Sequence, residues 1–283
     1  MNLQRFSFQR HPELAWEAAL TVGGLSIIAL TFVVYPRFDV ALSTARPSLS
    51  SAEADRQVEY AKSYLTSHPE DMNTYVALAM AYYQKGPAYY VEGMNALEKA
   101  RALGAVSDQL FYYAGVMYSA LGLPDYAINE FSKYLRHHPR NYETMIRIAN
   151  LHFQQKRIDQ AQALYQEAIG AWPKDATAWF NYALVNKEKG KYAEALECLD
   201  VVGRIAGQLP PGGLYQRGEI YRLKGEPDKA FELYQQEIAA QPDYVPALEA
   251  TETILKAKGE VKEARALRKR ISELKKKQAQ ANS

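Results

Sequence analysis

The chain contains few residues that could carry covalent or metal-dependent chemistry. Cys198 is the single cysteine among 283 residues, which excludes an intramolecular disulfide and a cysteine-based metal cluster. The sequence has no G-x-S-x-G, H-E-x-x-H, phosphate-loop or dinucleotide-binding motif. Three of the five histidines stand beside prolines at predicted helix ends, where a cationic or hydrogen-bonding side chain is favourable: His68, His137 and His138. The sequence therefore predicts a protein that is not an enzyme, with no cofactor and no metal.

Charge is distributed unevenly along the chain. Residues 256–277 contain ten Lys or Arg and three Asp or Glu, a local charge of +7. Because the whole chain has a net charge of +2, the other residues together carry −5. Such a stretch can bind anionic lipid headgroups or nucleic acid. Because Glu260, Glu263 and Glu273 are interspersed at helical spacings, it can also be the solvated face of a terminal helix. Nucleic acid is not expected as a partner if this part of the chain is translocated across a membrane.

A run without any charged residue extends from residue 18 to residue 35. Extended back to Leu14, it gives a helix of 22 residues, about 33 Å long, which is enough to cross a bilayer. Trp16 and Tyr35 stand near its two ends, where amphipathic rings favour the membrane interface, and Pro36 ends the helix. The pattern predicts a transmembrane helix at residues 14–35.

Two alternatives compete with a membrane anchor. A cleaved signal peptide needs small residues soon after the apolar run, but Ser43 and Ala45 lie roughly ten residues beyond it. A buried helix of a soluble domain is disfavoured by the length of the uncharged run. A stripe of small residues on the predicted anchor would let another membrane helix approach, unless it only reflects the frequency of small residues in such helices. The stripe consists of Ala15, Ala19, Gly23 and Ser26.

The charges that flank the predicted anchor indicate its orientation. Arg5, Arg10 and the α-amino group precede it, whereas Arg37 and Arg46 follow it. The positive-inside rule therefore favours a cytoplasmic N-terminus by a margin of one charge. We expect a single-pass protein of the bacterial inner membrane, with the rest of the chain in the periplasm.

A pattern of thirty-four residues occurs twice between Asp108 and Asp175. Small residues, bulky apolar residues and a late proline recur at fixed offsets. The first copy has Phe111, Ala114, Gly115, Tyr118, Ala127, Phe131, Tyr134 and Pro139, and the second has Met145, Ile148, Ala149, His152, Ala161, Tyr165, Ala168 and Pro173. The pattern resembles the tetratricopeptide repeat, in which each unit is a pair of amphipathic helices that must stack on its neighbours. The resemblance covers about three quarters of the chain.

The repeat register divides the whole chain. In the unit that begins near Met72 the turn carries a two-residue insertion at Pro87-Ala88, and in the last unit Glu252 and Arg268 replace residues that would normally be buried. The predicted segments are an N-terminal tail (1–13), the transmembrane helix (14–35), a linker (36–51), a packing helix (52–70), five repeats (71–107, 108–141, 142–175, 176–210 and 211–244) and a degenerate capping repeat (245–278). The expected fold class is all-α: an α-solenoid of about six units preceded by a single transmembrane helix.

The resemblance also implies where a partner would bind. In this family the first helix of each repeat lines a concave groove that recognises extended peptides or helices of other proteins. The corresponding residues are Val76, Met80 and Tyr83; Tyr112, Val116 and Ser119; Ile146, Asn150 and Phe153; Phe180, Leu184 and Lys187; and Tyr215, Glu219 and Arg222. A lining that is mostly apolar with a few polar groups suits an amphipathic segment. Packing inside the repeats is the alternative role for each of these side chains.

Some members of the family clamp the C-terminal carboxylate of a chaperone with Lys, Asn and Arg. Arg147, Asn150 and Asn181 fit parts of that clamp, but its lysines are missing, and Val76 stands where one would be needed. Chaperone-tail binding is therefore not predicted.

The expected function is that of a membrane-anchored scaffold for protein–protein interactions, in the assembly or stabilisation of a membrane protein complex. The assembly role rests on analogy with anchored bacterial proteins of similar layout. Two alternatives stay open: a permanent accessory subunit held through its transmembrane helix, and a lipid or nucleic-acid adaptor that acts through the basic C-terminal helix.

Overall fold

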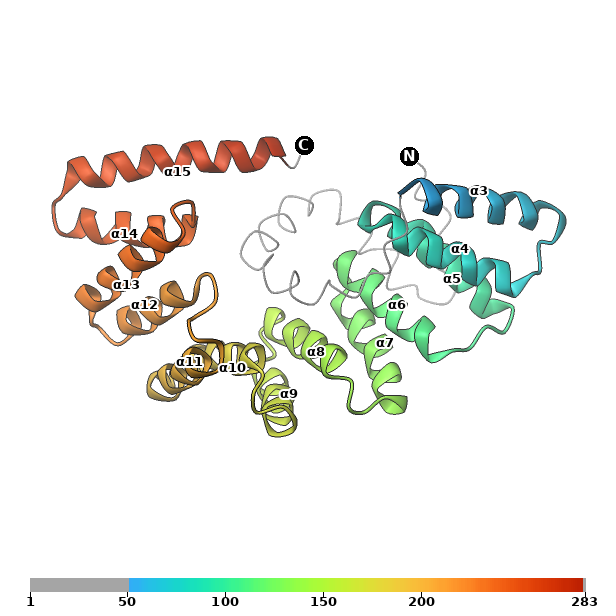
Figure 1. Ribbon diagram of the computed structural model, residues 1–283, viewed down its shortest axis with the longest axis horizontal. Helices are drawn as coiled ribbons and strands as arrows, with labels where there is room; N and C mark the ends of the chain where they lie inside the picture. Colours follow the sequence, from blue (N-terminus) through green and yellow to red (C-terminus); the bar gives the residue numbers. More distant parts are fainter. Residues whose placement is uncertain (1–50, 282–283) are drawn as a thin grey trace. The chain divides into compact units, whose positions relative to one another are not determined.

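The computed structural model describes residues 51–281, which form thirteen α-helices and one short 3₁₀-helix (Figure 1). The predicted membrane helix 14–35, with its stripe of Ala15, Ala19, Gly23 and Ser26, lies outside the described residues. So does the predicted linker 36–51, except for Ser51, which begins α3. Each helix between residues 51 and 281 is too short or too polar to span a bilayer. The anchor therefore stays a prediction from the sequence.

The chain forms two compact units, the first ending at Leu151 and the second beginning at His152. In the first unit, the described elements are α3 (Ser51–Ser67), α4 (Met72–Lys85), η3 (Pro87–Tyr89), α5 (Tyr90–Ala102), α6 (Asp108–Ala120), α7 (Pro124–His137) and most of α8 (Tyr142–Gln154). Helices that follow one another pack together: α3 on α4, α4 on α5, α5 on α6, and α6 on α7. The short 3₁₀-helix lies at the Pro87-Ala88 insertion.

Small residues allow the two helices of a pair to approach closely. Gly115 of α6 is buried against α7, and a β-carbon added to it would lie 2.5 Å from a ring carbon of Phe131. Ala114 and Ala127, which belong to the same repeat pattern, are fully buried. Glycine and alanine at these offsets thus leave the room that the aromatic ring of Phe131 fills, and burial of that ring drives the pairing.

The second unit continues with α9 (Ile158–Ala171), α10 (Ala176–Glu188), α11 (Tyr192–Ala206), α12 (Gly213–Leu223), α13 (Pro227–Ala240), α14 (Val245–Ala257) and α15 (Val261–Ala281). Consecutive helices again pack together from α9 to α15. Tyr165, Phe180, Leu199, Tyr234 and Leu248 are almost fully buried and form the interior of this unit. The predicted all-α repeat architecture is confirmed for residues 51–281.

The last helix pair carries the two charged residues that interrupt the repeat pattern. Arg268 of α15 forms an ion pair with Glu252 of α14, with 2.9 Å between Nη2 and Oε1. Lys256 contacts the same carboxylate oxygen at 2.7 Å. Glu252 therefore keeps charged partners in a position where the other repeats carry apolar residues, which suits the end of a stack of repeats.

Candidate protein-binding surface

The predicted groove residues lie on the first helix of each pair, and their exposure divides them into two sets. Ile146, Phe180 and Leu184 are at most 4 % exposed, and Phe153 is 9 % exposed. These four side chains pack inside the repeats. The other predicted residues are half-buried, except for the exposed Arg222: Val76, Met80, Tyr83, Tyr112, Val116, Ser119, Asn150, Lys187, Tyr215, Glu219 and Arg222. Partner binding through any of them stays a prediction.

Two groove residues of the first unit, Tyr83 and Tyr112, belong to a cluster of aromatic rings. We call Tyr83, Tyr90, Tyr112, Tyr113 and Tyr134 the tyrosine cluster. Its ring centroids are 4.8 Å apart for Tyr83 and Tyr113, 5.8 Å for Tyr83 and Tyr90, and 5.4 Å for Tyr112 and Tyr134. Rings at these distances attract one another beyond the burial of their area, so the cluster links α4, α5, α6 and α7.

The hydroxyl of Tyr112 connects this cluster to α8. It donates a hydrogen bond of 2.7 Å to Oε1 of Glu143, and burial raises the pKa of Tyr112 above its ordinary value. Arg147 donates to the same carboxylate oxygen through Nη2, at 2.9 Å. Because Glu143 already binds Arg147, the one arginine that fitted a carboxylate clamp is engaged within its own helix.

In the second unit the predicted residues form a polar cluster, which consists of Lys187, Gln216, Glu219, Arg222 and Tyr234. The Lys187 ammonium of α10 donates to Oε1 of Gln216 in α12 at 2.8 Å, and burial lowers the pKa of this lysine. Glu219 accepts a hydrogen bond from the Tyr234 hydroxyl and pairs with Arg222 at 2.8 Å. Burial alone would raise the pKa of Glu219, but the bonds from Arg222 and Tyr234 outweigh it, and the pKa is lowered.

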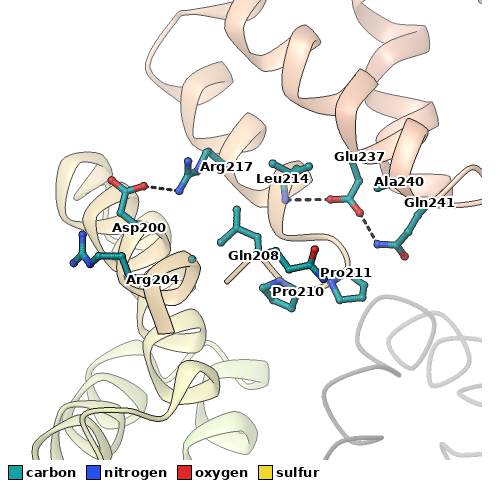
Figure 2. Close-up of a pocket in the computed structure, with 12 residues that line it drawn as sticks. Asp200, Arg204, Gln208, Pro210, Pro211, Leu214, Arg217, Glu237, Ala240 and Gln241 are labelled. Carbon is teal, nitrogen blue, oxygen red and sulfur yellow. Dashed lines mark hydrogen bonds and ion pairs between the residues drawn. The ribbon is translucent and has the colours of Figure 1, made fainter. Parts of the chain in front are cut away.

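The turn between α11 and α12 is capped by a carboxylate of α13 that the sequence pattern does not reveal. Glu237 of α13 is 2 % exposed and accepts hydrogen bonds from the backbone N–H groups of Gly212, Leu214 and Tyr215, at 2.9, 3.0 and 3.2 Å. Gln241 donates to Glu237 at 2.7 Å (Figure 2). A buried carboxylate thus satisfies the orphan donors at the start of α12 and complements its dipole.

One signal in the sequence could have identified Glu237. The same repeat offset is occupied by Ala168 and Val202 in the two preceding units, and both are buried. A glutamate at a position that is otherwise apolar must find donors. Gly212 of the preceding Pro-Pro-Gly-Gly turn and the first turn of α12 supply these donors. Gly212 has φ +81°, a left-handed conformation that favours glycine.

A cavity of about 880 Å³ lies beside this turn (Figure 2). Its walls come from the end of α11, the turn itself, α12 and α13. Arg217 of α12 reaches Asp200 of α11 across one side, as the dashed line in Figure 2 marks. The basic groups at this cavity are therefore partly neutralised.

Between residues 51 and 281, no group of three His, Cys, Asp or Glu side chains is placed to hold a metal ion. Cys198 is buried, and burial raises the pKa of its thiol to about 11. Such a thiol is a poor nucleophile at neutral pH.

Comparison with known proteins identifies the repeats. Residues 120–168 and 146–210 match two family models of the tetratricopeptide repeat. The solved structure of YrrB, described as a tetratricopeptide protein with an unusual peptide-binding site, is 23% identical with a TM-score of 0.53, covering 69% of this chain and 99% of that chain. PilW, described as a type IV pilus biogenesis factor, is 18% identical with a TM-score of 0.53, covering 72% and 91%.

A tetratricopeptide protein from Parabacteroides merdae is 15% identical with a TM-score of 0.63, covering 79% of this chain and 87% of that chain. Likeness at these identities shows the fold alone. No curated protein matches the chain in sequence. The chain therefore contains tetratricopeptide repeats, as predicted, and its function must be argued from its own surface.

Proposed function

We propose that the protein is a scaffold that binds segments of partner proteins on the first helices of its repeats. The observation that carries this proposal is the division of those helices into buried and open side chains. Ile146 and Phe180 fill the interior, whereas Met80, Val116 and Tyr112 keep part of their surface open. Partly exposed apolar side chains on a helical surface suit the binding of an amphipathic segment.

The two units offer different chemistry to such a segment. In the first unit, Val76, Met80 and Val116 share α4 and α6 with rings of the tyrosine cluster, so this surface favours apolar side chains. In the second unit, the Lys187 ammonium has three N–H donors, and one of them binds Gln216. Within residues 51–281 the other two donors have no acceptor. This surface favours an acceptor on the partner.

We also propose that residues 14–35 anchor the scaffold in a membrane. The support is the uncharged run from residue 18 to residue 35, its flanking Trp16 and Tyr35, and Pro36 at its end. An anchor would hold the repeats beside membrane proteins, which suits a role in assembling or stabilising a membrane complex. Extraction tests the anchor: the full chain should resist an alkaline wash of membranes and be released by detergent.

The test of the scaffold uses substitutions on the open part of the surface. The full chain, purified in mild detergent with its cross-linked partners, is compared with a Met80→Glu/Val116→Glu variant. The matched control is Val106→Glu/Val261→Glu, because those valines are 83% and 61% exposed and were not predicted to line the groove. We expect a defined set of partners to be lost from the first variant and kept by the control.

Two results would contradict the proposal. Partners that persist in the Met80→Glu/Val116→Glu variant would place recognition outside this surface, in the anchor or on the second helices of the repeats. A loss in both variants would indicate a non-specific effect of added charge. Thermal unfolding followed by circular dichroism verifies that both variants remain folded, because half-buried positions tolerate charge less well than exposed ones.

A further inference from the structure

The structure divides seven of the eight basic residues of α15 into two sets, and the exposed Lys277 belongs to neither. The first set is paired with acidic residues of the preceding helix and turn: Arg268 with Glu252, Lys275 with Glu249 at 2.6 Å, and Arg270 with Asp243 at 3.6 Å. Arg270 also donates to the backbone carbonyl of Pro242 at 2.6 Å. These cations hold α15 on α14, so they account for one side of the helix.

The second set lies on the opposite side, and we call it the outer basic face: Lys262, Arg265, Lys269 and Lys276. All four side chains are exposed. Within residues 51–281, Lys262, Arg265 and Lys276 have no carboxylate within 4.0 Å, and Lys269 reaches only Glu273, at the 4.0 Å limit.

Helical geometry places the outer basic face in one straight row. At about 100° per residue its four positions fall within about 60° of one another, and they span about 21 Å. Ala264 and Ile271, which are buried, lie on the other side. The helix α15 packs mainly against α14 (Figure 1). The row of cations is therefore directed away from the repeats, and within residues 51–281 the one carboxylate within 4.0 Å of it is Glu273 of α15 itself, beside Lys269.

We propose that the outer basic face binds the anionic headgroups of phospholipids, with α15 lying flat along the bilayer surface. A row of Lys and Arg on one side of a helix complements a plane of phosphates, and each contributes about fivefold to the ratio of bound to detached helix. Residues 261–281 contain no Phe, Tyr or Trp. Single-stranded nucleic acid would therefore find no ring for base stacking, which such binding normally uses.

The inference goes beyond the scaffold role, because it concerns a surface that contributes nothing to the groove. It adds a second, electrostatic attachment that would depend on lipid composition and on salt. The range of such an attachment is about one Debye length, roughly 10 Å at 0.1 M salt and about 3 Å at 1 M. Adsorption of α15 should consequently disappear at high salt.

The experiment measures energy transfer from a dye on α15 to an acceptor lipid. The dye is attached to the full chain at Ala266→Cys, an exposed position between Arg265 and Lys269, while the buried Cys198 stays unlabelled. Vesicles contain phosphatidylcholine alone or phosphatidylcholine with phosphatidylglycerol. We expect higher transfer on the anionic vesicles, abolished by salt. The readout is valid whether or not residues 14–35 insert, because it reports the position of α15 itself.

Two variants with equal charge change decide the assignment. The first replaces all four residues of the outer basic face by glutamine and should lower the ratio of surface-bound to detached α15 at least about a hundredfold. The second replaces four exposed basic residues on other helices and turns, and it should retain the transfer of the parent chain. The control positions are Lys99, Arg136, Arg140 and Lys174.

Three outcomes would overturn the inference. Transfer that is equal on neutral and anionic vesicles, or that survives in the first variant, would show that α15 does not bind lipid through this face. Binding of single-stranded RNA that is lost in the first variant, without any lipid effect, would assign the face to nucleic acid. Partner recovery in the Met80→Glu/Val116→Glu experiment is measured separately, so failure of one proposal leaves the other intact.

Discussion

The capping carboxylate of Glu237 gives a prediction whose size can be derived from the structure. Its two oxygens are both in use: Oε1 accepts from Gly212 N and from Gln241, and Oε2 accepts from Leu214 N and Tyr215 N. Replacement by alanine leaves three backbone donors without their acceptor, and each unsatisfied buried donor costs about 1–3 kcal/mol. The adjacent cavity of about 880 Å³ can admit water to some of these donors.

We therefore expect Glu237→Ala to lower the free energy of unfolding by about 3 kcal/mol, near the lower end of the sum. Glu237→Gln should lose about half as much, because its amide oxygen still accepts from one pair of donors while its NH₂ group faces the other pair. The matched control is Glu232→Ala on the same helix, where the side chain is exposed and the expected change is within about 0.5 kcal/mol.

Urea unfolding followed by circular dichroism measures the loss, and hydrogen exchange locates it. Exchange at the Leu214 and Tyr215 amides should accelerate most, since repeat proteins can open locally next to a damaged turn. The reasoning would be refuted by a Glu237→Ala variant within about 1 kcal/mol of the parent chain, or by unchanged protection of these two amides.

Two further perturbations test the packing and the polar cluster. Gly218→Ala would place a β-carbon 2.5 Å from the ring of Tyr234, so we expect a loss of about 1–3 kcal/mol in urea unfolding, whereas Gly203→Ala, which meets no atom within 4 Å, should lose nothing. The pKa of Glu219 is lowered from 4.5, so its ionisation stabilises the fold above pH 4.5, and this stabilisation is lost as the pH falls below 4.5. Glu219→Gln should remove the loss of stability that protonation of Glu219 causes at low pH. If the urea midpoint of this variant falls with pH as steeply as that of the parent chain, a stabilising role of ionised Glu219 is excluded.

The helical hairpins could be predicted from the sequence because the repeat pattern is local and repeated. Small residues such as Ala114 and Ala127 recur at fixed offsets, and each marks a close approach between helices that are neighbours along the chain. The hairpins of the described residues follow this pattern, and the family models match its central part. The spacing of these residues within the single chain is therefore sufficient to predict the helix pairs.

The exposure of the groove residues could not be predicted in the same way. Tyr112 and Phe180 occupy the same offset in their repeats, yet one is half-buried and the other is 1 % exposed. The difference depends on how much volume neighbouring helices supply around each position, and that volume is a property of the packed unit. An apolar residue at a groove offset is therefore predicted to lie on the first helix of its repeat, but its exposure cannot be predicted from the offset.

Charged residues show the same limit more sharply, because their roles depend on partners far away in the sequence. Glu237 caps a helix that begins 24 residues earlier, at Gly213, and Arg268 pairs across 16 residues with Glu252. The sequence shows ten basic residues from 256 to 277. It does not show which of them contact α14 and which are exposed without a partner from another helix. Once Arg268, Arg270 and Lys275 are assigned to internal pairs, four of the five remaining cations of α15 form a single row. These four cations therefore lie on one side of α15, facing away from the repeats. Because that side can face a membrane plane, binding to anionic lipid can be tested.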